Sequence, residues 1–244
     1  MRKMYLSAPL PFVGQKRMLA KEFMKVLEQY PDGTLFVDLF GGSGLLSHIT
    51  KSLKPHSTVI YNDFDNYRFR MKHIPQTNQL LADIREMVGN SVPRHKIIKG
   101  ELRERIFSRI EQEENSTGYV DFITLSSSIL FSMKYKLSVQ DMRKEALYNN
   151  IRKTGYPECT DYLEGLEIVS CDYKEVFNRY KDIPGVVFLV DPPYLSTDVG
   201  TYNMYWNMAD YLDVLNVLKG HSYTRKRLPD CVYFACIEQK SRRR

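Results

Sequence analysis

Short apolar runs alternate along the chain with segments whose apolar residues recur at helical spacing. Positions 35–40 and 186–190 are almost continuously apolar, which is typical of strands buried on both faces of a sheet. Between positions 15 and 29, apolar residues return every three or four positions, which predicts an amphipathic helix. A mixture of such strands and helices predicts an α/β fold.

The first strand begins a βαβ unit. It runs into the glycine-rich stretch 41–44, a helix begins near Leu45, and a second strand covers 58–61. Because a helical crossover of this kind joins parallel strands, the unit predicts a parallel, Rossmann-like sheet. The later predicted elements are strands at 166–171 and 186–190, a helix at 208–219 and an apolar run at 231–237.

The segment 67–161 differs from the rest of the chain. It is polar, rich in helix formers and without clear strand alternation, and its residues 111–118 are predicted to form a loop. We interpret the segment as a mostly helical insertion, so that residues 1–66 and 162–244 form one domain around it.

The charge and the polarity of the chain restrict its partners and its location. The 244 residues carry a formal net charge of +6, which fits a polyanion such as nucleic acid and equally a basic protein with no special partner. Pro9 and Pro11 precede any apolar run near the N-terminus, and no apolar stretch is long enough to cross a bilayer. We therefore predict no signal peptide and no membrane segment, and we expect a cytoplasmic protein.

The cysteines and histidines do not predict a metal site. The four cysteines contain no C-x-x-C pair, and the five histidines are scattered. We expect no bound metal, and free thiols in a reducing compartment.

A glycine turn after the first strand indicates a nucleoside cofactor. Gly42, Gly44 and Ser47 follow the pattern G-x-G-x-x-small, which allows a sharp turn and the close approach of a ligand. Asp63 follows the second strand, where a carboxylate can accept hydrogen bonds from both ribose hydroxyls. The pattern suits NAD and S-adenosylmethionine equally, and the turn alone would also serve tight packing of a strand on a helix.

The tetrapeptide Asp191-Pro192-Pro193-Tyr194, at the end of a very apolar strand, favours methyl transfer to an amino group. The lone pair of such a nitrogen in a base is delocalised into the ring. The Asp191 carboxylate and the Pro192 carbonyl can accept hydrogen bonds from the two N–H groups of this nitrogen and so free its lone pair. The paired prolines fix the backbone, which keeps both acceptors directed at the nitrogen. Tyr194 offers a flat face on which a flipped base can stack.

Together these motifs resemble those of the Dam-type adenine-specific DNA methyltransferases, in the order of that family. The F-x-G-x-G turn corresponds to residues 40–44 and the D-P-P-Y motif to residues 191–194. Residues 11–16 are similar to the family's P-x-x-G-G-K loop, with Gln15 in place of the second glycine. The resemblance covers about residues 5–218, and it implies a Rossmann-like methyltransferase sheet with S-adenosylmethionine as the cofactor.

The resemblance also implies roles for individual residues. Lys16 would bind the carboxylate of the cofactor, Asp63 its ribose and Asp172 its adenine. The implied cofactor site consists of Phe12, Gly14, Lys16, Asp38, Phe40, Gly42, Gly44, Asp63, Asp172 and Asp191. The implied catalytic residues are Asp191, Pro192, Pro193 and Tyr194.

Double-stranded DNA is the partner that the resemblance implies. The insertion 67–161 would recognise it, and residues 1–66 and 162–244 would form the catalytic domain. Basic residues of the insertion would contact phosphates, although basic helices are commonly just solvated; the candidates are Arg94, Lys96, Lys99, Lys134 and Lys136. Three aromatic residues after the D-P-P-Y motif would cap the flipped base or belong to the core: Tyr202, Tyr205 and Trp206.

Several alternatives stay open. The family's sheet has seven strands, three of them after the D-P-P-Y strand, whereas here the run at 231–237 is the one plausible strand after it. We therefore expect an incomplete C-terminal part of the sheet, so a catalytically defective remnant that binds cofactor or nucleic acid is one alternative. The same chemistry on cytosine amino groups or on RNA is a second, and a nicotinamide dehydrogenase is a third. The oligomeric state, the recognition sequence and the setting (restriction-modification, phage or housekeeping) are left open.

Overall fold

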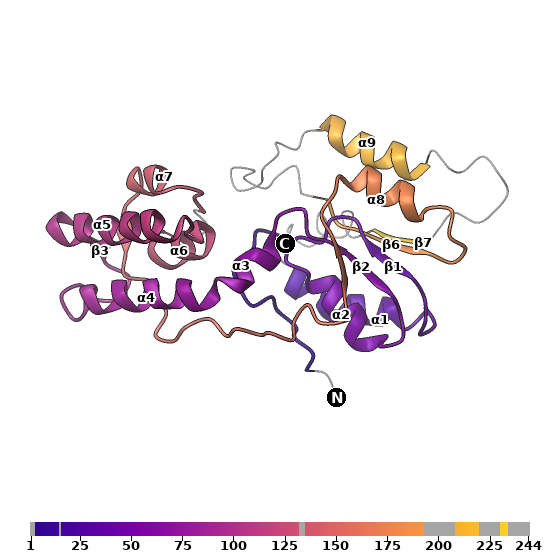
Figure 1. The fold of residues 1–244 in the computed structure, drawn as a ribbon, viewed down its shortest axis with the longest axis horizontal. Coiled ribbons are helices and arrows are strands. Elements are labelled where there is room, and N and C mark those ends of the chain that lie inside the picture. The colour runs from indigo at the N-terminus through magenta and orange to yellow at the C-terminus, as the bar shows by residue number, and fades with distance from the viewer. Residues whose placement is uncertain (1–2, 15, 132–134, 193–207, 220–229, 234–244) are drawn as a thin grey trace, which may run out of the picture. The chain divides into compact units, whose positions relative to one another are not determined.

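The chain forms two compact units in the computed structural model (Figure 1), which describes residues 3–14, 16–131, 135–192, 208–219 and 230–233. The sheet unit comprises Met1–Ala8, Gly14–Arg68 and Thr160–Arg244. The helical unit comprises Pro9–Val13 and Phe69–Cys159.

A parallel β-sheet forms the centre of the sheet unit. Among the residues that the structure describes, five strands lie in the order β5-β2-β1-β6-β7, and each neighbouring pair is parallel. The strands are β1 (Phe36–Asp38), β2 (Val59–Asn62), β5 (Glu167–Val169), β6 (Val187–Val190) and β7 (Asp230–Tyr233). The chain builds the sheet outward from β1 in one direction and then returns to place β6 on its other side. This Rossmann-like order confirms the predicted fold class and puts a topological switch point between β1 and β6.

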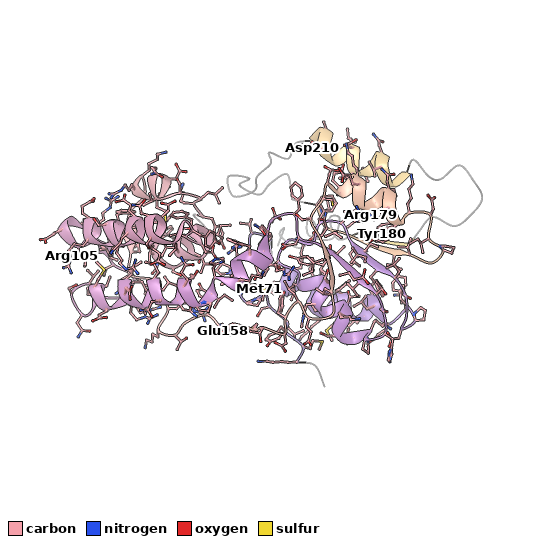
Figure 2. All side chains as sticks on the ribbon, viewed as in Figure 1. Met71, Arg105, Glu158, Arg179, Tyr180 and Asp210 are labelled. Carbon is pink, nitrogen blue, oxygen red and sulfur yellow. The ribbon has the colours of Figure 1, made fainter. Side chains whose placement is uncertain are left out.

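Helices cover both faces of this sheet (Figure 1). On one face, α1 and α2 pack against alternate strand residues such as Phe36 and Val187, and on the other, α8 and α9 pack against their neighbours Val37 and Phe188. Tyr180, labelled in Figure 2, packs half-buried against this second layer. The helices of this unit are η1 (Lys16–Met18, a 3-10 turn), α1 (Ala20–Leu27), α2 (Leu45–Leu53), α8 (Tyr173–Tyr180) and α9 (Met208–Lys219). Burial on both faces explains why the strands are continuously apolar in the sequence.

The helical unit confirms that the middle of the chain is mostly helical. Helix α3 (Tyr67–Lys72) leads into it, and α4 and α5 lie side by side (Figure 1). Its further elements are α4 (Ile74–Val88), α5 (Gly100–Thr117), α6 (Phe122–Ile129), α7 (Val139–Arg143) and an antiparallel pair, β3 (Ile97–Ile98) with β4 (Leu147–Tyr148). Strands of two residues are too short to show alternation, so no sequence pattern predicts this pair.

The predicted loop at 111–118 is wrong, because helix α5 continues through it to Thr117. Buried contacts of α5 come from Ile106, Phe107 and Ile110, and its final turns have few apolar residues to indicate a helix. Ion pairs stabilise this part of the helix instead: Arg143 binds Glu111 at 2.9 Å. Gly118 then ends the helix in the left-handed conformation.

One strand, β7, follows β6 in the described part of the chain. It coincides with the start of the apolar run predicted at 231–237, whose remaining residues lie outside the described ones. Among the described residues, no helix combines the length and the apolar character needed to cross a membrane.

The packing of α1 on the sheet leads to the first prediction. Phe23 is fully buried between α1 and the sheet, so Phe23→Ala removes a large apolar side chain and leaves a cavity. We expect the free energy of unfolding to fall by about 3–5 kcal/mol. Urea denaturation followed by circular dichroism measures this change. Met18→Ala is the control, because Met18 is 82% exposed, and it should change the value by less than about 0.5 kcal/mol. Equal effects of the two changes would contradict this packing.

Candidate functional site

Four aspartates follow the ends of four neighbouring strands. Asp172 comes after β5, Asp63 after β2 and Asp191 after β6, while Asp38 is the last residue of β1. Because these strands are parallel and adjacent, their carboxyl ends meet at one edge of the sheet. Open α/β sheets bind ligands at this edge, next to the switch point. The structure thus brings the predicted acidic residues to one edge, in the order Asp172, Asp63, Asp38, Asp191.

The carboxyl group of Asp38 is the most unusual group at this edge. It is 1% exposed, and its Oδ2 accepts a hydrogen bond of 2.7 Å from the hydroxyl of Ser47 on α2. Its Oδ1 is buried and has no hydrogen-bond partner among the described residues. Burial raises the pKa of Asp38 to about 7, and the charge of Asp191 adds to this rise. The bond from Ser47 opposes it, as does the nearby backbone N–H of Phe40, which does not reach hydrogen-bond geometry with Oδ1. A buried acceptor without a donor is costly unless a ligand supplies one.

Asp191 lies beside Asp38 across the switch point and is held by a cation. The Nζ of Lys16 lies 3.1 Å from Asp191 Oδ1, and the side chains are 8% and 12% exposed. The same Nζ donates to the carbonyl of Gly14 at 2.8 Å, and Gly14 has a φ of +74°. The glycine bend therefore turns the predicted loop so that its lysine meets the predicted catalytic carboxylate.

Asp63 binds the beginning of helix α3. Its Oδ1 accepts hydrogen bonds from the backbone N–H of Tyr67 (2.6 Å) and from the hydroxyl of Tyr61 (3.0 Å), and its Oδ2 accepts one from the N–H of Arg68 (3.0 Å). Burial raises the pKa of Asp63, and these hydrogen bonds lower it. Because a carboxylate has about four acceptor positions, roughly one is left, on Oδ2. This leaves room for one hydrogen bond from a ribose, whereas the sequence predicted two.

Asp172 and Phe40 lie at the start of α8. Asp172 caps that helix, since its Oδ1 accepts the N–H of Lys174 at 2.8 Å. The ring of Phe40 lies 4.9 Å from that of Tyr173, between centroids. The role of Asp172 toward a cofactor adenine therefore stays a prediction, in which a capping side chain would have to serve two functions.

The glycine turn itself is tightly packed. A Cβ atom on Gly41 would lie 2.3 Å from ring atoms of Tyr61, so no larger residue fits there without a shift of the backbone or the ring. Gly42 and Gly44 have φ values of +49° and +71°, which favour glycine. The turn then passes directly into α2, for which Gly44 is the N-cap residue.

Of the remaining predicted site residues, the structure describes Pro192 and Phe12. Pro192 is buried directly after Asp191, and Phe12 is half-buried in the helical unit. The residues outside the described ones are Pro193, Tyr194, Tyr202, Tyr205 and Trp206.

Sequence reasoning missed three polar residues at this edge. Asn62 links two strand ends, because its Nδ2 donates to the carbonyls of Leu39 and Cys171 at 3.0 Å each. Tyr61 and Tyr162 are fully buried next to the glycine turn. Asn62 could have been predicted from its position at a strand end, directly before Asp63. No local sequence pattern distinguishes the two tyrosines from tyrosines that only fill space in a core.

The basic residues predicted to contact DNA in the helical unit differ in their contacts with the protein itself. Arg94 donates to the carbonyl of Ile151 at 2.7 Å, and Lys136 pairs with Glu145 at 3.1 Å, so each has a structural partner. The side chains of Lys96 and Lys99 are exposed. The fifth candidate, Lys134, lies outside the described residues. Phosphate contact by these residues stays a prediction, which Lys96 and Lys99 fit best.

The described residues form no candidate metal centre. Within the described ranges, no three His, Cys, Asp or Glu side chains come close enough together to hold a metal ion. The aspartates at the sheet edge are spread along four strands, which suits a row of hydrogen-bond acceptors more than a metal cage.

Comparison with known proteins agrees with the motifs and the fold. The model of the D12 class N6 adenine-specific DNA methyltransferases matches residues 12–222, which include the glycine turn and all four aspartates. A Haemophilus influenzae protein named "Putative methyltransferase" is 38% identical over 224 residues, covering 89% of this chain and 75% of that protein. The resemblance to Dam-type enzymes is thus confirmed: the chain belongs to the D12 class N6 adenine-specific DNA methyltransferase family.

Proposed function

We propose that this chain transfers a methyl group from S-adenosylmethionine to the exocyclic N6 nitrogen of adenine in DNA. Its family supports methyltransferase activity. The observation that carries the finer proposal is the position of Asp191, beside the buried carboxyl of Asp38 at the switch point of the sheet. The target base and the cofactor would bind next to each other, beside the carboxyl groups of Asp191 and Asp38.

The residues present at the edge fit S-adenosylmethionine. That cofactor offers hydrogen-bond donors at its ammonium, its ribose hydroxyls and its adenine amino group, and the edge offers carboxylate acceptors. Asp38 Oδ1, which has no donor from the described residues, suits the ammonium; Asp63 Oδ2 suits one ribose hydroxyl. Within the sheet unit, Gly14, Lys16, Phe40, Gly42, Gly44 and Asp172 complete the proposed site; a cofactor contact by Phe12, which belongs to the helical unit, stays a prediction. When bound, the cofactor supplies a methyl group on a positively charged sulfur.

Asp191 and Pro192 would orient the target amino group. The Asp191 carboxylate accepts one N–H bond and the Pro192 carbonyl the other, so that the nitrogen lone pair is directed away from the ring. The ion pair with Lys16 holds the Asp191 side chain in place in the free protein. Tyr194 would stack on the flipped base, as the sequence predicts. Alignment of this kind accounts for most of the rate acceleration in direct displacements without a covalent enzyme intermediate.

Double-stranded DNA would be recognised by the helical unit. Its exposed lysines, Lys96 and Lys99, are suited to phosphate contacts, which position a duplex without reading its sequence. Arg105, labelled on α5 in Figure 2, is also exposed, whereas Arg103 and Arg109 form ion pairs with acidic neighbours.

Substitution of Asp191 tests the proposed chemistry. We expect the wild-type protein to transfer labelled methyl from S-adenosylmethionine to unmethylated DNA, and nucleoside analysis to find the label on adenine N6. Asp191→Ala should keep cofactor binding and lower turnover by about 100-fold or more. Asp191→Asn, which keeps the size of the side chain and an oxygen for Lys16, should do the same, because an amide is a weaker acceptor than a carboxylate.

Asp32→Asn is the matched control for this test. Asp32 lies before β1, at the amino end of the sheet, where its Oδ1 accepts the N–H groups of Gly33 and His56. This change should leave turnover near that of the wild type. Normal turnover in both Asp191 variants would contradict the mechanism. Label on cytosine, or transfer to RNA alone, would contradict the proposed substrate.

The pKa of Asp38 makes cofactor binding depend on pH. In the free protein the pKa is about 7, above the ordinary value of 3.8, so the protonated form is favoured by folding and its stabilising contribution is lost as pH rises through about 7. An ammonium binds the ionised carboxylate better, so affinity for S-adenosylmethionine should rise between about pH 6 and pH 7.5, with proton release below pH 7. Calorimetry in buffers of different ionisation enthalpy measures both quantities. Asp38→Asn should abolish the proton release, and an unchanged release in that variant would rule out Asp38 as its source.

A further inference from the structure

The carbonyl groups of the glycine turn are bound in two different ways. Gly41 and Gly44 use the backbone: Gly41 O accepts the N–H of Gly44 at 2.7 Å, and Gly44 O accepts the N–H of His48 at 2.8 Å. The two carbonyls between them accept side-chain hydroxyls. Gly42 O takes a hydrogen bond of 2.8 Å from Tyr61, and Ser43 O takes one of 3.1 Å from Tyr162. Two tyrosine hydroxyls thus donate hydrogen bonds to the two central carbonyls of the turn.

Tyr61 supports the turn from strand β2. The side chain is fully buried, and its ring fills the space in which a Cβ of Gly41 would otherwise lie. Its hydroxyl also lies 3.0 Å from Oδ1 of Asp63. Because a phenol has a single proton, the carbonyl of Gly42 and the carboxylate of Asp63 share it. Tyr61 therefore connects the turn to the acidic residue proposed to bind the ribose.

Tyr162 supports the turn from the opposite end of the insertion, where the chain re-enters the sheet unit. It is also fully buried, and its ring stacks on that of His48 with centroids 4.6 Å apart and an angle of 14°. The Nδ1 of His48 lies 2.7 Å from the carbonyl of Tyr162 itself. Both the ring and the backbone of Tyr162 are thereby fixed to helix α2, which begins at the turn.

We propose that Tyr61 and Tyr162 are positioning residues for the cofactor, which act by holding the glycine turn in its binding conformation. This inference rests on the proposed function, since it assumes that the turn binds S-adenosylmethionine. Neither hydroxyl would touch the cofactor, because each is directed at a carbonyl of the turn. Without its tyrosine, a carbonyl in this buried environment lacks a donor, and the turn relaxes to find another.

The geometry favours positioning over simple packing. The two hydroxyls come from residues far apart in the sequence and bind adjacent peptide groups, with positive φ at Gly42 and Gly44 on either side. A tyrosine that only filled space would not need its hydroxyl, because phenylalanine has nearly the same shape. The hydroxyls are thus the atoms to remove.

Tyr61→Phe and Tyr162→Phe, made singly and together, provide the test. Titration calorimetry with S-adenosylmethionine should show Kd raised by about fivefold to tenfold in each single variant. In methyl transfer, KM for S-adenosylmethionine should rise, while kcat at saturating cofactor and KM for DNA stay near those of the wild type. Tyr156→Phe is the matched control: Tyr156 is a buried tyrosine of the helical unit whose hydroxyl lies 3.4 Å from that of Ser128. It should not change Kd.

The outcomes separate this inference from the function on which it rests. If the wild-type protein binds S-adenosylmethionine and the Tyr61 and Tyr162 variants bind it equally well, positioning is refuted, whatever their thermal stability. If the wild-type protein does not bind it at all, the proposed function fails and the inference fails with it. Because Kd is measured without DNA, a protein that binds the cofactor but transfers no methyl still tests the two tyrosines.

Discussion

The structure depends on the parallel pairing of β1 with both β2 and β6. This pairing brings the ends of four strands to one edge, and each of these ends carries an aspartate. Carboxylates that close to one another repel, and burial penalises their charge. The repulsion acts most on Asp38, where the charge of Asp191 adds to the effect of burial, and the pKa of Asp38 reaches about 7. The topology therefore gathers acidic groups at the edge where the positively charged cofactor is proposed to bind.

The four carboxyl groups differ in how far the protein itself uses them. Asp172 caps α8, Asp63 binds the first N–H groups of α3, and Asp191 is paired with Lys16. Asp38 alone retains a buried oxygen without a partner in the part of the chain that the structure describes. Hydrogen bonds from helix N–H groups hold the side chains of Asp172 and Asp63 in place. The proposed cofactor site would therefore combine acceptors that the protein already holds in place with one acceptor, on Asp38, that has no donor from the described residues.

The sequence predicted the sheet, the glycine turn and the aspartates, because each rests on local patterns: apolar runs, glycines and acidic residues at strand ends. It did not predict what these side chains contact. Asp63 and Asp172 each precede a helix, which is a signal for capping, yet their position at strand ends suggested a ligand role alone. The bonds from Tyr61 and Tyr162 join distant residues through the fold, so no local pattern indicates them. Helix α5 was missed at 111–118 because ion pairs, not apolar spacing, stabilise its end.

The pairing of Lys16 with Asp191 links the two halves of the proposed reaction. The resemblance assigns Lys16 to the carboxylate of the cofactor, whereas in the structure its ammonium lies 3.1 Å from the carboxylate proposed to hold the target base. If Lys16 binds both carboxylates, its position would depend on both the cofactor and the target base. Both side chains of the pair are nearly buried, so each charge depends on the other for its stabilisation in the free protein. A positively charged cofactor bound as proposed would take over part of that neutralising role, and Lys16 could then bind the carboxylate of the cofactor at a lower electrostatic cost. The same ion pair would thus stabilise the acidic edge in the free protein and still allow a positive ligand to bind there.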